Sequence, residues 1–145
     1  MELQIAQRKK AKIKMAITGP SGTGKTYSSL LLAHGLCMDW GKVVVIDSEN
    51  NSSHLYTNLG AFNVLNLESP YSPECYIDAI DFVINQGMEV IILDSITHEW
   101  EYLLDYHSSL PGNSFTAWSK VTPRHQAFIS KLLQVPVHII ATIRS

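Results

Sequence analysis

The sequence predicts a three-layer α/β fold, in which helices cover both faces of a parallel β-sheet. Four short apolar runs rich in β-branched residues span 13–18, 43–47, 90–94 and 137–142. Each run is nearly continuous rather than alternating, which is the pattern of strands buried on both faces of a parallel sheet. Stretches with helix signals separate the runs, and this alternation of strands and helices defines the class.

Two helices are expected around the second strand. The first begins in a glycine-rich loop after the first strand and runs until Gly41 breaks it. The second has Ser72 as its N-cap and Pro73 in its first turn, and Gly87 follows its apolar face. These signals place one helix before the second strand and one after it.

The stretch between the third and fourth strands is rich in aromatic residues. We expect a helix over 97–106 and a turn at 111–113. Thr122 and Pro123 repeat the start signal of the second helix, so a further helix is predicted from there to just before Pro136. The aromatic side chains either pack together as a satellite core or stack on nucleic-acid bases. They are Trp100, Tyr102, Tyr106, Phe115 and Trp118.

Length and composition indicate one compact domain, residues 1–145, in a reducing compartment. The two cysteines, Cys37 and Cys75, are too few for a disulfide framework and do not form a Cys-x-x-Cys pair. No apolar stretch approaches the ~20 residues that cross a bilayer, and the polar start lacks a signal-peptide core. We therefore expect a cytoplasmic protein with no membrane partner.

Positive charge is concentrated at the start of a chain whose net charge is −2. Residues 1–12 form a basic lead-in segment, which either contacts phosphates or an acidic neighbour or is simply solvated. Five of the 11 basic residues precede or open the first strand: Arg8, Lys9, Lys10, Lys12 and Lys14.

A phosphate-binding loop connects the first strand to the first helix. It fits G-x-x-x-x-G-K-[ST] at every fixed position and has the strand and helix that the motif requires on either side. Its glycines let successive backbone N–H groups point at phosphate oxygens, and the helix N-terminus adds positive charge. The alternative is a glycine-rich turn without a ligand. The loop residues are Gly19, Pro20, Ser21, Gly22, Thr23, Gly24, Lys25 and Thr26.

The end of this loop predicts a nucleoside triphosphate with Mg²⁺. Lys25 is expected to act in catalysis by placing its charge between the β- and γ-phosphates, and the Thr26 hydroxyl is a predicted magnesium ligand. Tyr27 is a candidate neighbour of the base of the bound nucleotide. Asp94 ends the third strand, as in a Walker B element, and is predicted to hold Mg²⁺ through water. Many strands end in Asp for turn chemistry alone, but the upstream loop favours the metal role.

A residue that polarises the attacking water is needed for hydrolysis. Asp47 and Glu49 both follow the second strand, at the sheet edge where ligands of open α/β folds bind. Either one could serve, or could simply cap a loop. Thr142, at the end of the fourth strand, is a candidate contact of the γ-phosphate, and Arg144 lies just beyond it; both could equally be ordinary loop residues.

Three stretches in order resemble the RecA-like branch of P-loop ATPases. They are the phosphate loop, Val-Val-Val-Ile-Asp-Ser-Glu at 43–49, and Val-Ile-Ile-Leu-Asp-Ser at 90–95. In that branch the catalytic glutamate follows the strand after the phosphate-loop helix, so the resemblance implies Glu49. It also implies that the four strands lie in the order 1-4-3-2 across the sheet.

A narrower resemblance covers nearly the whole chain from Lys12 onward. The stretches 94–101, 118–125 and 138–145 look like phage and prophage ATP-binding proteins with an AAA domain, a RecA-like group tied to recombination and single-strand annealing. This resemblance implies an ATPase that uses ATP and Mg²⁺ and forms a homo-oligomer. It also implies single-stranded DNA as a partner of the full-length protein and a phage or prophage gene in a bacterial host.

One departure from the RecA-like pattern concerns the end of the chain. RecA-like cores have five or more strands with the phosphate-loop strand inside, whereas here the first strand would form an exposed edge. We therefore expect the domain to be truncated at its C-terminus, without the DNA-contacting loop that follows the fourth strand in that branch. Lys120, Arg124 and Arg144 are candidates for a charge donated to a neighbouring subunit, although any of them could be solvated.

Two other functions use the same loop. A small-molecule kinase needs an acceptor pocket and usually an arginine-rich lid, and the sequence has no such arginine cluster. A nucleotide-dependent binding module would bind the triphosphate but hydrolyse little of it.

Overall fold

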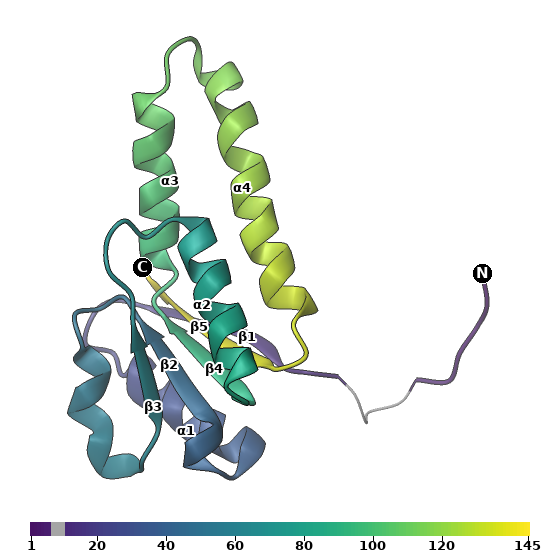
Figure 1. Cartoon of the computed structure of the whole chain (residues 1–145), viewed down its shortest axis with the longest axis vertical. Helices are drawn as coiled ribbons and strands as arrows, with labels where there is room; N and C mark the ends of the chain where they lie inside the picture. Colours follow the sequence, from purple (N-terminus) through teal and green to yellow (C-terminus); the bar gives the residue numbers. More distant parts are fainter. Residues whose placement is uncertain (7–10) are drawn as a thin grey trace.

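A computed structural model describes residues 1–6 and 11–145 and contains one five-stranded parallel sheet (Figure 1). Its order is β1-β5-β4-β2-β3. The strands are β1 (Lys14–Gly19), β2 (Val43–Asp47), β3 (Asn63–Asn66), β4 (Val90–Asp94) and β5 (His138–Arg144). The four expected strands therefore lie in the predicted order, with the phosphate-loop strand at one edge. Three basic residues of the lead-in segment, Arg8, Lys9 and Lys10, lie outside the described residues.

Helices cover the two faces of the sheet, as the three-layer prediction requires. Helix α1 (Lys25–Cys37) packs on one face, and α2 (Pro73–Asn85) and α4 (Ser114–Gln134) pack on the other. Neighbouring residues of β2 alternate between these layers: Val45 contacts the α1 side and Val44 the α2 side. The fold is thus an α/β P-loop nucleotide-binding fold.

The strands at the centre of the sheet match the continuous apolar pattern, and those at its edges do not. Every residue of β2 and β4 is buried. The expectation of burial on both faces is wrong for β1, where Met15 and Ala16 are exposed, because this strand has a neighbour on one side only. Strand β3 was not predicted, because Asn63 and Asn66 bracket only two apolar residues and this run is too short to stand out.

The ends of α1 and α2 depend on local backbone chemistry. Ser72 caps α2 as predicted, accepting a hydrogen bond from the backbone N–H of Cys75 at 3.2 Å. Helix α1 ends at Cys37, earlier than the predicted stop at Gly41. Met38 adopts a left-handed conformation there (φ 57°), and its N–H donates to the carbonyl of His34.

Helices α3 (Thr97–Ser109) and α4 form a hairpin that extends beyond the sheet (Figure 1). The predicted helix start at Thr122 and Pro123 is wrong: α4 begins at Ser114, where the Asn113 side chain accepts from the N–H of Thr116 at 2.8 Å. Proline lacks an N–H and normally breaks a helix. Here the helix continues because its buried face runs through Ala117, Val121, Phe128 and Leu132, on both sides of the proline.

Aromatic side chains join the two helices of this hairpin. Trp100 of α3 stacks on Trp118 of α4 at 6.0 Å between ring centroids, and His107 lies 4.2 Å from Trp118. Phe115, near the tip, is exposed. Aromatic rings therefore pack against each other between the two helices, as the satellite-core interpretation expects. No described helix is both long enough and apolar enough to cross a membrane.

Candidate nucleotide-binding site

The loop between β1 and α1 presents a helix N-terminus to the pocket. Gly22 and Gly24 have φ values of 82° and 86°, a region that other residues adopt only with strain. Gly24 is the N-cap of α1, and no side chain caps the helix among the described residues. The first turn also carries no acidic residue. Its N–H groups and partial positive charge are thus available to an anion such as phosphate.

Lys25 lies across the opening of the loop. Its ammonium donates to the carbonyl oxygens of Gly19 at 2.8 Å and Pro20 at 2.9 Å. The Thr23 hydroxyl donates to the same Pro20 carbonyl at 2.7 Å, which tightens the curl. The loop therefore holds the lysine charge beside its own amide groups.

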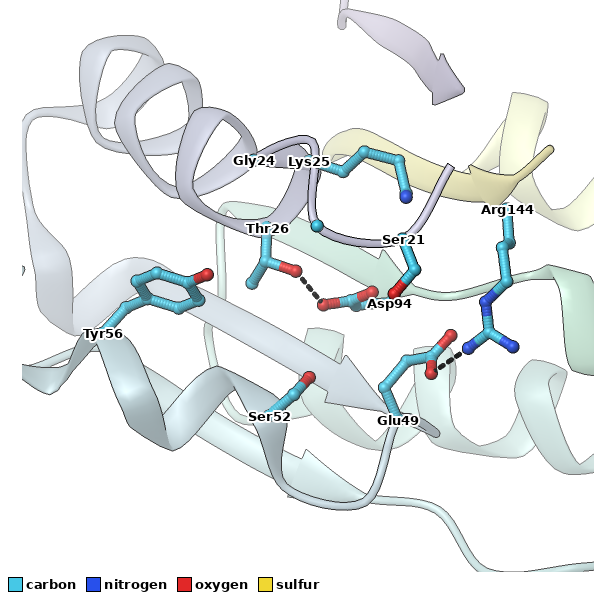
Figure 2. Close-up of a pocket in the computed structure, with 10 residues that line it drawn as sticks. Ser21, Gly24, Lys25, Thr26, Glu49, Ser52, Tyr56, Asp94 and Arg144 are labelled. Carbon is cyan, nitrogen blue, oxygen red and sulfur yellow. Dashed lines mark hydrogen bonds and ion pairs between the residues drawn. The ribbon is translucent and has the colours of Figure 1, made fainter. Parts of the chain in front are cut away.

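Asp94 is buried beside the loop and is held by two hydroxyl groups. Thr26 Oγ1 donates to Asp94 Oδ2 at 2.7 Å, and Thr142 Oγ1 donates to Asp94 Oδ1 at 2.9 Å (Figure 2 shows the Thr26 bond). Burial raises the pKa of the Asp94 carboxyl, whereas both hydroxyl hydrogen bonds lower that pKa. Thr142 is fully buried, so it reaches the site through Asp94.

The oxygen pair formed by Thr26 and Asp94 fits a magnesium ion. A hydroxyl and a carboxylate are the hard oxygen ligands that Mg²⁺ prefers, and Mg²⁺ in phosphate sites usually has one or two protein ligands plus water and substrate oxygens. The two oxygens already lie 2.7 Å apart at the pocket wall. The donor chemistry of these residues thus agrees with the predicted metal site.

The two acids that follow β2 have different surroundings. The Asp47 carboxylate accepts from Ser53 Oγ at 2.6 Å and from the N–H of Glu49 at 2.7 Å, so it organises its own loop. Glu49 lines the pocket, where it accepts from Ser95 Oγ at 2.9 Å and pairs with Arg144 (Figure 2). Of the two candidates, Glu49 is therefore the one that faces the phosphate loop.

The resulting pocket has a volume of about 190 Å³. Its remaining wall is the 3₁₀ helix η2 (Ser52–Leu59), which contributes Ser52 and Tyr56 (Figure 2). Tyr27 of α1 is partly exposed, and its ring lies 6.0 Å from that of Tyr56. The pocket lining is Ser21, Gly22, Gly24, Lys25, Thr26, Glu49, Ser52, Tyr56, Asp94 and Arg144.

Two residues of this lining, and one residue that contacts it from behind, were absent from the sequence prediction. Ser52 and Tyr56 belong to no motif, and only the fold of η2 brings them to the loop. Ser95 directly follows Asp94, so its place in the chain could have indicated a role, but its bond to Glu49 could not be read from the sequence.

The three basic residues that are candidates for a charge donated to a neighbouring subunit lie in three different environments. Arg144 lines the pocket of its own chain. Arg124 forms an ion pair with Glu74 at 2.8 Å and lies over the Tyr102 ring. Lys120 is exposed on α4, so its role for a neighbour stays a prediction.

The fold and this site define a P-loop nucleotide-binding protein, because the loop, the Walker B aspartate and the glutamate lie at the carboxyl edge of one parallel sheet. A protein family described as "AAA domain" matches residues 11–145. The chain belongs to this AAA-domain family, a family of nucleotide-binding ATPases. A comparison with curated proteins found no match.

Proposed function

We propose that this protein is a magnesium-dependent ATPase of the RecA-like branch that acts in phage DNA recombination or annealing. One observation carries the ATPase assignment: Lys25, Asp94 and Glu49 converge on one pocket, although they come from three distant parts of the chain. A glycine-rich turn without a ligand gives no reason for these groups to meet there.

The chain's own residues account for nucleotide binding. The N–H groups of the loop and the Lys25 ammonium bind the β- and γ-phosphates. Thr26 would hold Mg²⁺ directly and Asp94 would hold it through water. When bound there, Mg²⁺ would neutralise negative charge on the phosphates. Tyr27 and Tyr56 lie beside each other at the pocket margin, where a base could stack on either ring.

Glu49 supplies the base for hydrolysis. Its carboxylate orients a water molecule and accepts a proton as the water oxygen forms a bond to the γ-phosphorus. The bond between the γ-phosphorus and the bridging oxygen breaks, and ADP leaves with that electron pair. The proton then passes from Glu49 to the released phosphate or to solvent, which restores the carboxylate.

The assignment to DNA recombination depends on the resemblance of three sequence stretches to phage ATP-binding proteins. The partners that follow from it are single-stranded DNA for the full-length protein and further copies of the chain. The role of Thr142 also belongs to the proposal: it acts on the γ-phosphate indirectly, by orienting Asp94.

The test measures phosphate release from ATP with and without Mg²⁺ and single-stranded DNA. We expect magnesium-dependent release that Glu49→Gln reduces by at least about 100-fold, because loss of a general base typically costs 10²–10⁴-fold. Lys25→Ala should weaken nucleotide binding, and Lys131→Ala, which breaks an ion pair with Asp81 outside the pocket, serves as the control. Nucleotide binding is measured in parallel by calorimetry.

The outcomes separate the candidate functions. Stimulation by DNA that is lost in Glu49→Gln supports the proposal. Transfer of phosphate to an added metabolite would replace it with a kinase, and tight binding without turnover would replace it with a binding module. Absence of magnesium-dependent nucleotide binding, with no effect of Lys25→Ala, would refute all three.

A further inference from the structure

Arg144 and Glu49, which both line the pocket, form an ion pair with each other (Figure 2). Arg144 ends β5, and Glu49 lies two residues beyond β2. These two strands flank β4 in the sheet, so the pair lies over the end of the strand that carries Asp94. The guanidinium donates to Glu49 Oε2, the carboxylate oxygen that Ser95 does not bind.

The backbone of Arg144 is anchored independently of its side chain. Its N–H donates to Thr97 Oγ1 at 2.9 Å, and the N–H of Ser145 donates to the carbonyl of Gly19 at 3.1 Å. The second bond joins the end of β5 to the first residue of the phosphate loop. The side chain is 43% exposed and has Glu49 as its ion-pair partner among the described residues. The guanidinium can therefore change partners while its Cα stays fixed beside the loop.

The Arg144 guanidinium is expected to interact more strongly with phosphate than with the Glu49 carboxylate. An ion pair between partly exposed groups contributes up to about fivefold to an equilibrium. Arg forms bidentate, charge-assisted hydrogen bonds with phosphate oxygens, which contribute about tenfold or more. A γ-phosphate held by Lys25 would bring such oxygens into the pocket that Arg144 lines. From these magnitudes we expect a triphosphate to compete successfully with Glu49 for the guanidinium.

We propose that Arg144 exchanges Glu49 for the γ-phosphate of the bound nucleotide, so that a triphosphate, but not a diphosphate, releases the Glu49 carboxylate to take a proton from water. This inference rests on the proposed function. Ser95 keeps hold of Glu49 Oε1 during the exchange, so the freed Oε2 stays in place. Arg144 is thereby a catalytic residue of its own chain.

The experiment measures equilibrium affinity for a non-hydrolysable ATP analogue and for ADP, both with Mg²⁺, on the full chain. Arg144→Ala should weaken analogue binding about tenfold and leave ADP binding unchanged. Arg144→Lys should recover part of the loss because it retains the charge without the bidentate fork. Arg124→Ala, which breaks the matched Arg–Glu pair outside the pocket, should change neither affinity.

A second comparison tests the exchange itself. Glu49→Gln removes the carboxylate that competes for Arg144. It should therefore strengthen analogue binding more in a chain that retains Arg144 than in Arg144→Ala, where no arginine can be released. Circular dichroism confirms that each variant is folded.

An equal loss of analogue and ADP affinity in Arg144→Ala, or no loss of either, would overturn the proposal. So would the same effect of Glu49→Gln in both backgrounds. These failures differ from failure of the proposed function, in which wild-type protein would bind neither nucleotide and Lys25→Ala would change nothing.

Discussion

Replacing Ser95 with alanine removes one hydroxyl that positions Glu49. Ser95 is buried, and its Oγ donates to Glu49 Oε1 at 2.9 Å. Hydrogen bonds to charged groups contribute about 1.5–3 kcal/mol. Glu49 is 20% exposed and keeps its contact with Arg144, so water and the guanidinium replace part of the loss. We therefore expect a cost of about 1 kcal/mol in the transition state, which is roughly a fivefold lower kcat.

Steady-state phosphate release and nucleotide affinity together check this expectation. Ser95→Ala should lower kcat without changing affinity, because Ser95 Oγ touches Glu49 and does not line the pocket. Ser72→Ala is the matched control, since losing the N-cap of α2 costs about 1 kcal/mol of folding free energy far from the pocket. If kcat is unchanged in Ser95→Ala, or falls equally in Ser72→Ala, Ser95 does not position the base.

Two further predictions concern pH. Burial raises the pKa of Asp94 above the ordinary value of an aspartate, and only the ionised carboxylate can help to hold the proposed Mg²⁺. Magnesium-nucleotide affinity should therefore fall as the pH is lowered through that raised pKa, and titrations with Asp94→Asn should show weaker binding and a flatter pH dependence. Burial also raises the pKa of Glu99, which contacts His125 Nδ1 at 3.0 Å. The contribution of Glu99 to folding stability is complete below its unfolded pKa and is lost as the pH rises through its folded pKa. Urea unfolding should therefore show Glu99→Gln to be more stable than wild type at neutral pH, with a stability that depends less on pH. A loss of stability in Glu99→Gln at neutral pH would contradict this.

The sequence predicted those elements whose apolar pattern matches their burial in the folded protein. The bounds of β2 and β4 match the predicted runs because both strands are buried on both faces and their residues are apolar throughout. Pro123 misled the prediction of α4 because proline normally marks a helix start or end, whereas continuous packing of the helix's buried face compensates for one lost hydrogen bond. Edge strand β3 carries too few apolar residues to give a signal.

The sequence predicts those site residues that belong to contiguous motifs. The loop and Asp94 could be placed from the residues alone, because a strand and a helix must flank such a loop. Choosing Glu49 over Asp47 needed a family resemblance, since both acids follow the same strand. The contact between Glu49 and Arg144 joins residues 95 positions apart, and only the parallel order of β5, β4 and β2 brings them together.

The helical hairpin is joined to the carboxyl edge of the sheet by hydrogen bonds at the first turn of α3. Ser48 Oγ lies 2.8 Å from His98 Nδ1 and accepts from the N–H of Ser95, whose hydroxyl binds Glu49. Thr97, the first residue of α3, accepts from the N–H of Arg144. Both members of the Glu49–Arg144 pair are therefore connected to the first turn of α3. Glu49 is connected through Ser95 and Ser48, and Arg144 through its own backbone. A movement of the hairpin that displaces the first turn of α3 must lengthen these bonds, so the position of Glu49, the proposed base, is coupled to the position of that turn.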